Sequence, residues 1–295
     1  MSSSLAGIRT SLAPLRIGVH PVRDAAVYLG LTLALSWLFW LPGAFLRTMG
    51  IGAGEVLIAA GSFMPLLVAF GLNLVAGRRT FEWGNWFRTL NLRNISVAIL
   101  LPVLILTPII LYRLYEQSFD LMGFVLDLRG LALVVPGLFV LAFAEEVGWR
   151  GFLLRRLDSS YRVYLANFVI GFAWFFWQIP IILSQPHDLY LGDAAQHLAA
   201  FLLYSIAITP FFNRLALRSE FNVLLPALLR TALTAAFLVY TNQGPVTLLT
   251  SPMGIGAIAW LAALNLLLFG QLWQGKPSGN ESELERVMPL EPAIK

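Results

Sequence analysis

The sequence predicts an all-α fold: a polytopic membrane bundle of about eight transmembrane helices with both termini in the cytoplasm. Three observations support this prediction. Hydrophobic residues make up 58% of the 295 residues and charged residues only 12%, which is far from the composition of a soluble globular domain. Apolar windows of membrane-spanning length recur along the chain. Lysine and arginine gather in alternate connections between these windows.

The apolar windows have the length of membrane-spanning helices. A helix rises 1.5 Å per residue and the hydrocarbon core is about 30 Å thick, so about 20 apolar residues make one span. Eight windows meet this criterion: 25–46, 55–76, 95–115, 131–157, 163–184, 195–217, 221–240 and 253–273. The fourth and sixth carry charges at their ends, so we expect these two helices to be longer than the membrane is thick.

The basic residues give the orientation, because cytoplasmic loops collect positive charge. Fifteen of the 20 lysines and arginines fall in the two tails and in the second, fourth and sixth connections. Only Arg47, Arg113 and Arg129 fall in the other connections, and Arg150 and Arg230 lie inside spans. This asymmetry places both termini in the cytoplasm. It also accounts for the net charge of +4 without nucleic acid as a partner.

The domain organisation follows from these spans. Residues 1–24 form a cytoplasmic juxtamembrane tail, 25–273 the transmembrane domain and 274–295 a flexible cytoplasmic tail. The first tail is serine-rich and bears arginine, as transit peptides do, but its prolines and glycine favour a segment that touches anionic lipid. Residues 80–93 pair aromatic with basic residues, which predicts an interfacial helix. Cysteine is absent, which excludes disulfides, thiolate nucleophiles and cysteine metal sites.

Four charged residues lie inside the predicted spans: Glu145, Glu146, Arg150 and Arg230. A charge at the centre of a span costs about 2.5 to 3.5 kcal/mol on insertion scales, so such residues are hypotheses about function. Glu146 and Arg150 are four residues apart and can form an ion pair on one helical face. Glu145 is turned about 100° away from that pair. It is therefore the better candidate for chemistry.

Depth in the membrane suggests a partner for Glu145. Counted from Arg155, the two glutamates lie about 14 to 15 Å above the cytoplasmic boundary. Counted from Phe221 in the oppositely directed seventh span, Arg230 lies at about 13 to 14 Å. If the fourth and seventh spans are neighbours, Arg230 is positioned to pair with Glu145. The same count places no histidine near the glutamates.

Other polar residues in the spans are expected to form hydrogen bonds between helices. These residues are Gln178, Asn167, Thr231, Thr234 and Asn213. The aromatic run 174–177 is expected to pack against lipid and neighbouring helices rather than to form a ligand platform.

The segment EEVGWR, residues 145–150, fits the pattern EExxxR and is followed by GFLLRRL. It resembles the first motif of the CPBP family, the CAAX proteases and bacteriocin-processing membrane endopeptidases, and a WxxxQxP segment at 174–180 follows at the distance of the second motif. The resemblance covers a core of about residues 95–240. It implies an intramembrane hydrolase in which the first glutamate, here Glu145, activates water with help from a histidine in a second motif, FxxxH. A third motif, HxxxN or HxxxD, supplies oxyanion contacts or metal ligands.

This sequence departs from the family pattern at both histidines. Gln178 occupies the histidine position of the second motif, and Arg230 and Thr234 occupy the histidine and asparagine positions of the third. Glutamine cannot shuttle a proton, and arginine is always protonated, so neither can serve as a base or metal ligand. No metal or other cofactor is expected. The candidate site residues are Glu145, Glu146, Arg150, Gln178, Arg230 and Thr234.

Three functions remain open. The first is a protease-like protein with lost or reduced peptidase activity that binds a polypeptide, lipid or lipidated segment in a membrane cavity. The second is a working, metal-independent endopeptidase in which Glu145 is the base and Gln178 and Arg230 stabilise the oxyanion, with a polypeptide or prenylated peptide as substrate. The third is a transporter or channel, although no repeated halves are visible. The default location is a prokaryotic plasma membrane, with membrane lipids as partners.

Overall fold

The computed structural model describes residues 21–76, 89–117, 120, 122–123, 130–158, 163–184, 194–241 and 251–273, and these residues contain helices and no strand. In chain order, the described elements are α1 (Pro21–Thr48), α2 (Ala53–Ser62), α3 (Met64–Val75), α5 (Leu92–Tyr115), α7 (Val135–Glu146), the π-helical segment η1 (Val147–Leu154), α8 (Arg155–Asp158), α9 (Val163–Leu183), α10 (Ala194–Arg218), α11 (Leu224–Thr241) and α12 (Ile255–Trp273).

The predicted fold class is confirmed, since the described chain is a bundle of apolar helices. Within the described residues, five helical stretches are long and apolar enough to cross a membrane: α1, α2 together with α3, α5, most of α9, and α10. Two shorter apolar helices lie within α11 and α12. The number of eight spans and the cytoplasmic termini stay predictions.

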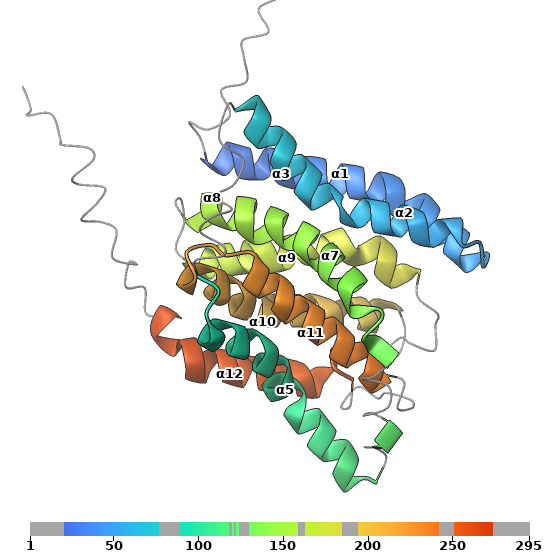
Figure 1. The fold of residues 1–295 in the computed structure, drawn as a ribbon, viewed down its shortest axis with the longest axis vertical. Coiled ribbons are helices and arrows are strands. Elements are labelled where there is room, and N and C mark those ends of the chain that lie inside the picture. The colour runs from blue at the N-terminus through green and yellow to red at the C-terminus, as the bar shows by residue number, and fades with distance from the viewer. Residues whose placement is uncertain are drawn as a thin grey trace, which may run out of the picture.

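The helices stack in successive layers (Figure 1). The hairpin of α1 with α2 and α3 lies at one edge, α7 and α9 come next, α10 and α11 follow, and α5 and α12 lie at the opposite edge. Helix α10 packs against α9, α11, α12 and η1, so it is the central helix. One cluster of buried side chains joins α1, α3, η1 and α9. A second joins α5, α9, α10, α11 and α12.

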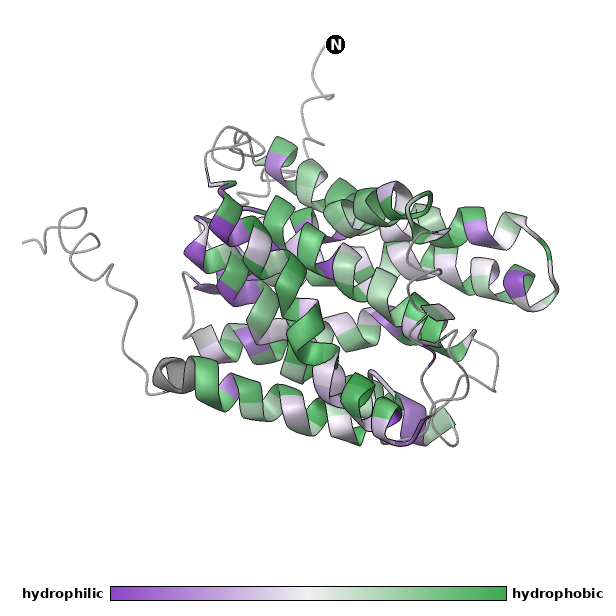
Figure 2. Cartoon of the chain, turned by 60° about the horizontal axis from the view of Figure 1, so that its bottom comes forward, coloured by the Kyte–Doolittle hydropathy of each residue, from purple (hydrophilic) through white to green (hydrophobic). Residues whose placement is uncertain are grey.

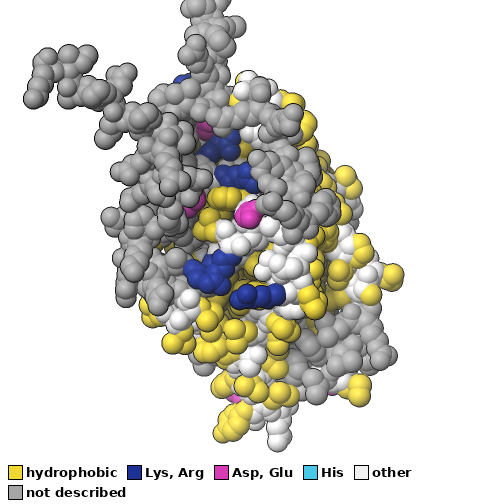
Figure 3. Space-filling view, turned by 60° about the vertical axis from the view of Figure 1, so that its left-hand side comes forward, with side chains coloured by type: hydrophobic (Ala, Val, Ile, Leu, Met, Phe, Trp, Pro, Cys, Tyr) yellow, Lys and Arg dark blue, Asp and Glu magenta, His cyan; other side chains and the backbone are white. Residues whose placement is uncertain are grey.

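The outer surface of the bundle is apolar, as a lipid-facing surface must be. Hydrophobic residues cover the outer helices (Figure 2). Leu38, Val103 and Leu267 expose 66%, 58% and 77% of their surface, respectively. Arginines, in contrast, gather at one end of the bundle (Figure 3). These two features agree with an integral membrane protein whose two ends differ in charge.

Two predicted spans are interrupted. The second is divided at Phe63, where α2 ends and α3 begins with Pro65 in its first turn. The fourth changes from α-helix to π-helix directly after Glu146, and all eight residues of η1 are buried. Gly148 lets η1 approach α3, since a Cβ there would lie 2.6 Å from Pro65 Cβ and 2.7 Å from the Pro65 carbonyl oxygen.

Several predicted helix boundaries shift by a few residues in the structure. Helix α1 begins at Pro21, so the predicted tail 1–24 ends with four helical residues. Helix α5 begins at Leu92, where the side chain of Asn91 accepts a hydrogen bond from the Asn94 backbone N–H and caps the helix. Most of the predicted interfacial helix 80–93 lies outside the described residues, as do residues 1–20 and the predicted tail 274–295.

Candidate functional site

Glu146 and Arg150 form the predicted ion pair in the middle of the bundle. Nη1 of Arg150 donates to both carboxylate oxygens of Glu146 at 2.9 Å. The Glu146 side chain is fully buried and that of Arg150 is 3% exposed. The pair forms although η1 is π-helical, because Arg150 still reaches back one turn to the last residue of α7. Glu146 therefore has both oxygens occupied by a guanidinium.

Two asparagines extend this pair across the bundle. Nε of Arg150 donates to Oδ1 of Asn213 at 3.1 Å, and Nδ2 of Asn213 donates to Oδ1 of Asn167 at 2.8 Å. The Arg150 guanidinium also lies 4.7 Å from the ring centroid of Phe212, at a distance favourable for a cation–π contact. The predicted interhelical hydrogen bonding is thus confirmed for Asn167 and Asn213. Thr231, in contrast, bonds within its own helix, to the carbonyl of Ala227.

Glu145 pairs with Arg230, as the depth count predicts. Nη2 of Arg230 contacts Oε2 of Glu145 directly, and Nη1 lies 3.7 Å from Oε1 of Glu146. The guanidinium carbon of Arg230 lies 4.8 Å from the ring centroid of Trp174. Helices α7 and α11 are neighbours, which brings the two side chains together. The Arg230 side chain is 13% exposed, whereas that of Arg150 is 3% exposed.

A partly open cavity of about 170 Å³ lies beside Arg230, between α9, α10 and α11. Its lining is Trp174, Gln178, Ile181, Ile182, His197, Phe201, Tyr204, Phe212, Arg230, Leu233, Thr234, Phe237 and Met253. Gln178, Arg230 and Thr234, the residues at the second- and third-motif positions, thus border one cavity. Most of the other walls are aromatic or aliphatic, as in most ligand sites.

The six predicted site residues fall into two sets. Arg230, Gln178 and Thr234 line the cavity, and Glu145 joins this set through Arg230. Glu146 and Arg150 belong to the buried network behind it. Among the described residues, no group of three or more His, Asp or Glu side chains is placed to hold a metal ion.

The sequence interpretation missed His197 and Trp174 as cavity residues. His197 is 4% exposed, and it lines the cavity from the first turn of α10. Trp174 lines the cavity and stacks on Arg230, whereas only packing against lipid and helices was expected. Counting residues from the membrane boundary gives a side chain's position along the helix axis, but not the direction in which it points around that axis. The periodicity of α10 does give a signal: His197, Phe201 and Tyr204 are four and three residues apart, on one face.

Comparison with known proteins gives one informative result, while no family model matches the chain. The chain is 28% identical to a protein named CAAX prenyl protease 2 from Methanococcus maripaludis, over 164 residues. This match supports a relationship to the CPBP family of CAAX proteases. The aligned part covers 51% of this chain and 60% of that relative. The chain therefore spans well under the full length of the relative that it matches.

Proposed function

We propose that this chain is a CPBP-type intramembrane protease-like protein in which peptidase chemistry is lost or reduced. In this proposal the cavity beside Arg230 binds a polypeptide, lipid or lipidated segment. We place the protein in a prokaryotic plasma membrane, in keeping with the archaeal source of the similar protein. The ion pair between Glu145 and Arg230 is the observation that carries the proposal.

The argument begins with what a general base needs. A carboxylate that activates water needs a free lone pair directed at that water and a group that takes the proton onward. The carboxylate of Glu145 is engaged by Arg230, and an arginine stays protonated and cannot accept a proton. Gln178 has no titratable group. The residues that border the cavity thus favour binding over hydrolysis.

A peptidase assay tests this proposal. Wild-type protein, Glu145→Gln and the double variant Gln178→His/Arg230→His are reconstituted in liposomes and given a fluorogenic apolar peptide. We expect wild type to cleave no faster than Glu145→Gln. The double variant restores imidazoles at both motif positions, and we expect it to cleave about 100-fold faster or more, the usual contribution of acid–base catalysis.

Controls separate chemistry from folding. The double variant combined with Glu145→Gln should return to the background rate, and Gln178→Leu/Arg230→Leu should stay at background. All variants must elute as monodisperse protein. Wild-type cleavage that is abolished by Glu145→Gln would overturn the proposal.

A working endopeptidase is the second candidate, and the position of Arg230 favours it. Arg230 touches Glu145 and borders the cavity together with Gln178, so both side chains could donate to an oxyanion beside the base. In this case Arg230→Met lowers the cleavage rate of wild type about 100-fold, the cost of one oxyanion donor. Under the first proposal, the same substitution does not lower the cleavage rate.

A further inference from the structure

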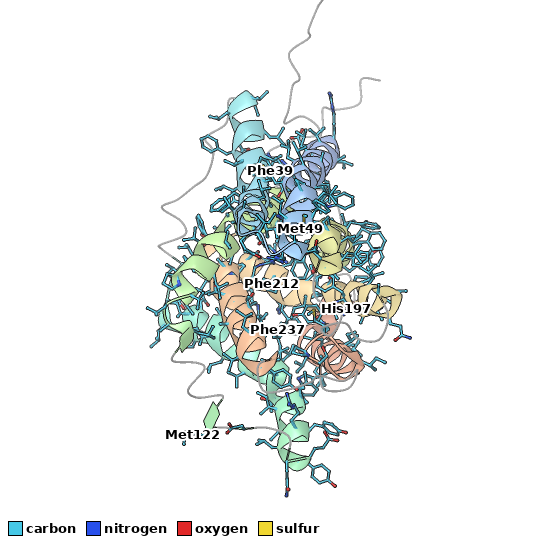
Figure 4. All side chains as sticks on the ribbon, turned by 90° about the vertical axis from the view of Figure 1, so that its right-hand side faces the viewer. Phe39, Met49, Met122, His197, Phe212 and Phe237 are labelled. Carbon is cyan, nitrogen blue, oxygen red and sulfur yellow. The ribbon has the colours of Figure 1, made fainter. Side chains whose placement is uncertain are left out.

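The size of the cavity limits what it can hold. Its volume is about 170 Å³. A cavity of about 150 Å³ in a protein core holds one benzene molecule, so this cavity has room for a single six-membered ring with small substituents. Three of its lining residues, His197, Phe212 and Phe237, lie together in the middle of the bundle in Figure 4. The cavity therefore fits one compact group at a time.

Aromatic rings form much of the cavity wall. Trp174 contributes from α9, Phe201, Tyr204 and Phe212 from α10, and Phe237 from α11. The ring centroids of Trp174 and Phe201 lie 5.6 Å apart, those of Phe201 and Tyr204 6.2 Å, and those of Tyr204 and Phe237 6.0 Å. These contacts make a continuous row of rings from α9 across α10 to α11. A flat ring in the cavity can pack against their faces and edges.

Three polar side chains of the lining are left without a hydrogen bond. Gln178 on α9, Tyr204 on α10 and Thr234 on α11 form none with any residue that the structure describes. The amide and both hydroxyls can donate, and so can Arg230, which borders the same cavity. A polar group left unpaired away from water is costly. A ligand that accepts hydrogen bonds is therefore favoured here.

The donors stand at two levels along the helices. Trp174 on α9 and Arg230 on α11 are level, since the guanidinium carbon lies 4.8 Å from the ring centroid. Gln178 and Thr234 follow them by four positions on helices that run in the same direction, so both lie about 6 Å further along. A ring with acceptors at two opposite positions can therefore meet one donor level with each acceptor.

A ligand without net charge suits the cavity. Arg150 and Arg230 are matched by Glu145 and Glu146, and ion-pair contacts join all four residues. An anionic ligand would compete with Glu145 for Arg230, and a cationic ligand would compete with Arg230 for Glu145. Burying a further, unpaired charge among aromatic walls is costly. A neutral acceptor such as a carbonyl oxygen avoids both penalties.

We propose, building on the function proposed above, that the cavity binds the head group of a membrane quinone, a flat neutral ring with two carbonyl oxygens on opposite sides. This class of lipid combines ring size, aromatic faces and uncharged acceptors. It also dissolves in the bilayer that surrounds the bundle. Binding alone is meant, with no transfer of electrons, and the same cavity can hold the ring whether or not peptidase activity remains.

Equilibrium dialysis of the protein in nanodiscs tests the ligand class. Duroquinone is a tetramethyl six-membered ring with two carbonyls, and durene is the tetramethylbenzene that lacks them. Empty nanodiscs measure how much of each compound dissolves in the lipid. We expect duroquinone to fill one saturable site per chain. It should bind at least tenfold more tightly than durene, the factor expected for one hydrogen bond or more.

Variants locate the bound ring. Gln178→Leu and Thr234→Val each remove a hydrogen-bonding group at similar size, so each should weaken duroquinone binding about tenfold and leave durene binding unchanged. Thr231→Val is the matched control and should change neither, because Thr231 bonds to the Ala227 carbonyl and lies outside the lining. Leu233→Trp fills the cavity and should abolish binding of both compounds. Every variant must elute as monodisperse protein.

Four results would contradict the quinone site. They are no saturable duroquinone binding, durene binding as tight as that of duroquinone, displacement of duroquinone by an equal concentration of monoolein, and unchanged duroquinone binding in both Gln178→Leu and Thr234→Val. The second result would mean a site for apolar rings, and the third a site for an ester lipid, which offers the same carbonyl acceptor. The fourth would place the quinone elsewhere on the protein.

The outcome is separate from that of the peptidase assay. Dialysis uses no peptide, so a failure to bind duroquinone leaves the proposed loss of peptidase activity intact. Hydrolysis that depends on Glu145 would overturn that loss and leave the quinone site intact.

Discussion

Glu145 and Glu146 are consecutive residues in different environments. Glu146 is fully buried and receives two hydrogen bonds from Arg150. Arg150 also donates to Asn213 on α10, and Asn213 donates to Asn167 on α9. Glu145 pairs with Arg230, whose side chain is 13% exposed and borders the cavity. The difference shows that Glu146 is held inside the bundle, whereas Glu145 is linked to the cavity through Arg230. Free energies of unfolding can test this division.

The largest loss of unfolding free energy is expected for Arg150→Met. This change leaves the buried Glu146 with Arg230 alone at 3.7 Å, and breaking a buried ion pair by removing one partner costs about 3 to 5 kcal/mol. Reversible denaturant unfolding in bicelles measures the loss. The double variant Glu146→Gln/Arg150→Met should recover part of it. A loss below that of Arg230→Met would reverse the comparison.

Asn213→Ala should cause the next largest loss of unfolding free energy, about 1 to 3 kcal/mol, because it leaves Nε of the buried Arg150 without a hydrogen-bond acceptor. Asn167→Ala is the matched control, since it removes only the bond to Asn213 and leaves Arg150 bonded. The same unfolding experiment compares the two variants. Equal losses would show that Asn213 does not act through Arg150.

Arg230→Met should lower the unfolding free energy less, by about 1 to 2 kcal/mol, because the Arg230 side chain is 13% exposed and borders the partly open cavity, so water can fill the space it leaves beside Glu145. The loss includes the contact between the guanidinium and Trp174. Unfolding of Arg230→Met and of Arg230→Met/Glu145→Gln measures it. The double variant should be at least as stable as the single one, and a less stable double variant would argue against the ion pair as the cause.

The smallest effect is expected for the exposed pair of Arg47 and Glu55, which join the ends of α1 and α2 with two hydrogen bonds of 2.7 and 2.6 Å. Glu55 is 61% exposed, and exposed ion pairs contribute about 0.2 to 1 kcal/mol. Glu55→Gln should therefore lower the unfolding free energy by no more than that amount. It should have a weaker effect in high salt. A salt-independent loss would show that the pair is not electrostatic.

The sequence predicted the charged contacts better than the helix geometry. The spacing of four residues predicted the pair of Glu146 and Arg150, and equal depth predicted Arg230 as the partner of Glu145. Both predictions depend only on the rise and period of a helix. The break at Phe63 and the π-helical segment η1 were not predicted. Hydropathy measures apolar length, and an interrupted helix is as apolar as a continuous one.

The cavity could be predicted only in part. Gln178, Arg230 and Thr234 were singled out because they stand at motif positions, and they line the cavity together. His197 lies on α10 outside the motifs, and its place depends on how α10 is rotated against α9 and α11. That rotation is set by packing such as that at Gly171, where a Cβ would come 2.9 Å from Ile206 Cα. The periodicity of α10 places His197 on one face with Phe201 and Tyr204, but it does not say which helices that face meets.

Gly148 links the N-terminal hairpin to the charged residues. It is the second residue of η1, two positions before Arg150, and it is in contact range of Pro65 on α3 and Tyr28 on α1. Even one methyl group here would push α3 away from η1. The packing of α1 and α3 against η1 therefore fixes where the guanidinium of Arg150 lies. A chain shortened to begin at α5 would lose this support, and its glutamates would have no defined geometry even though every motif residue were present.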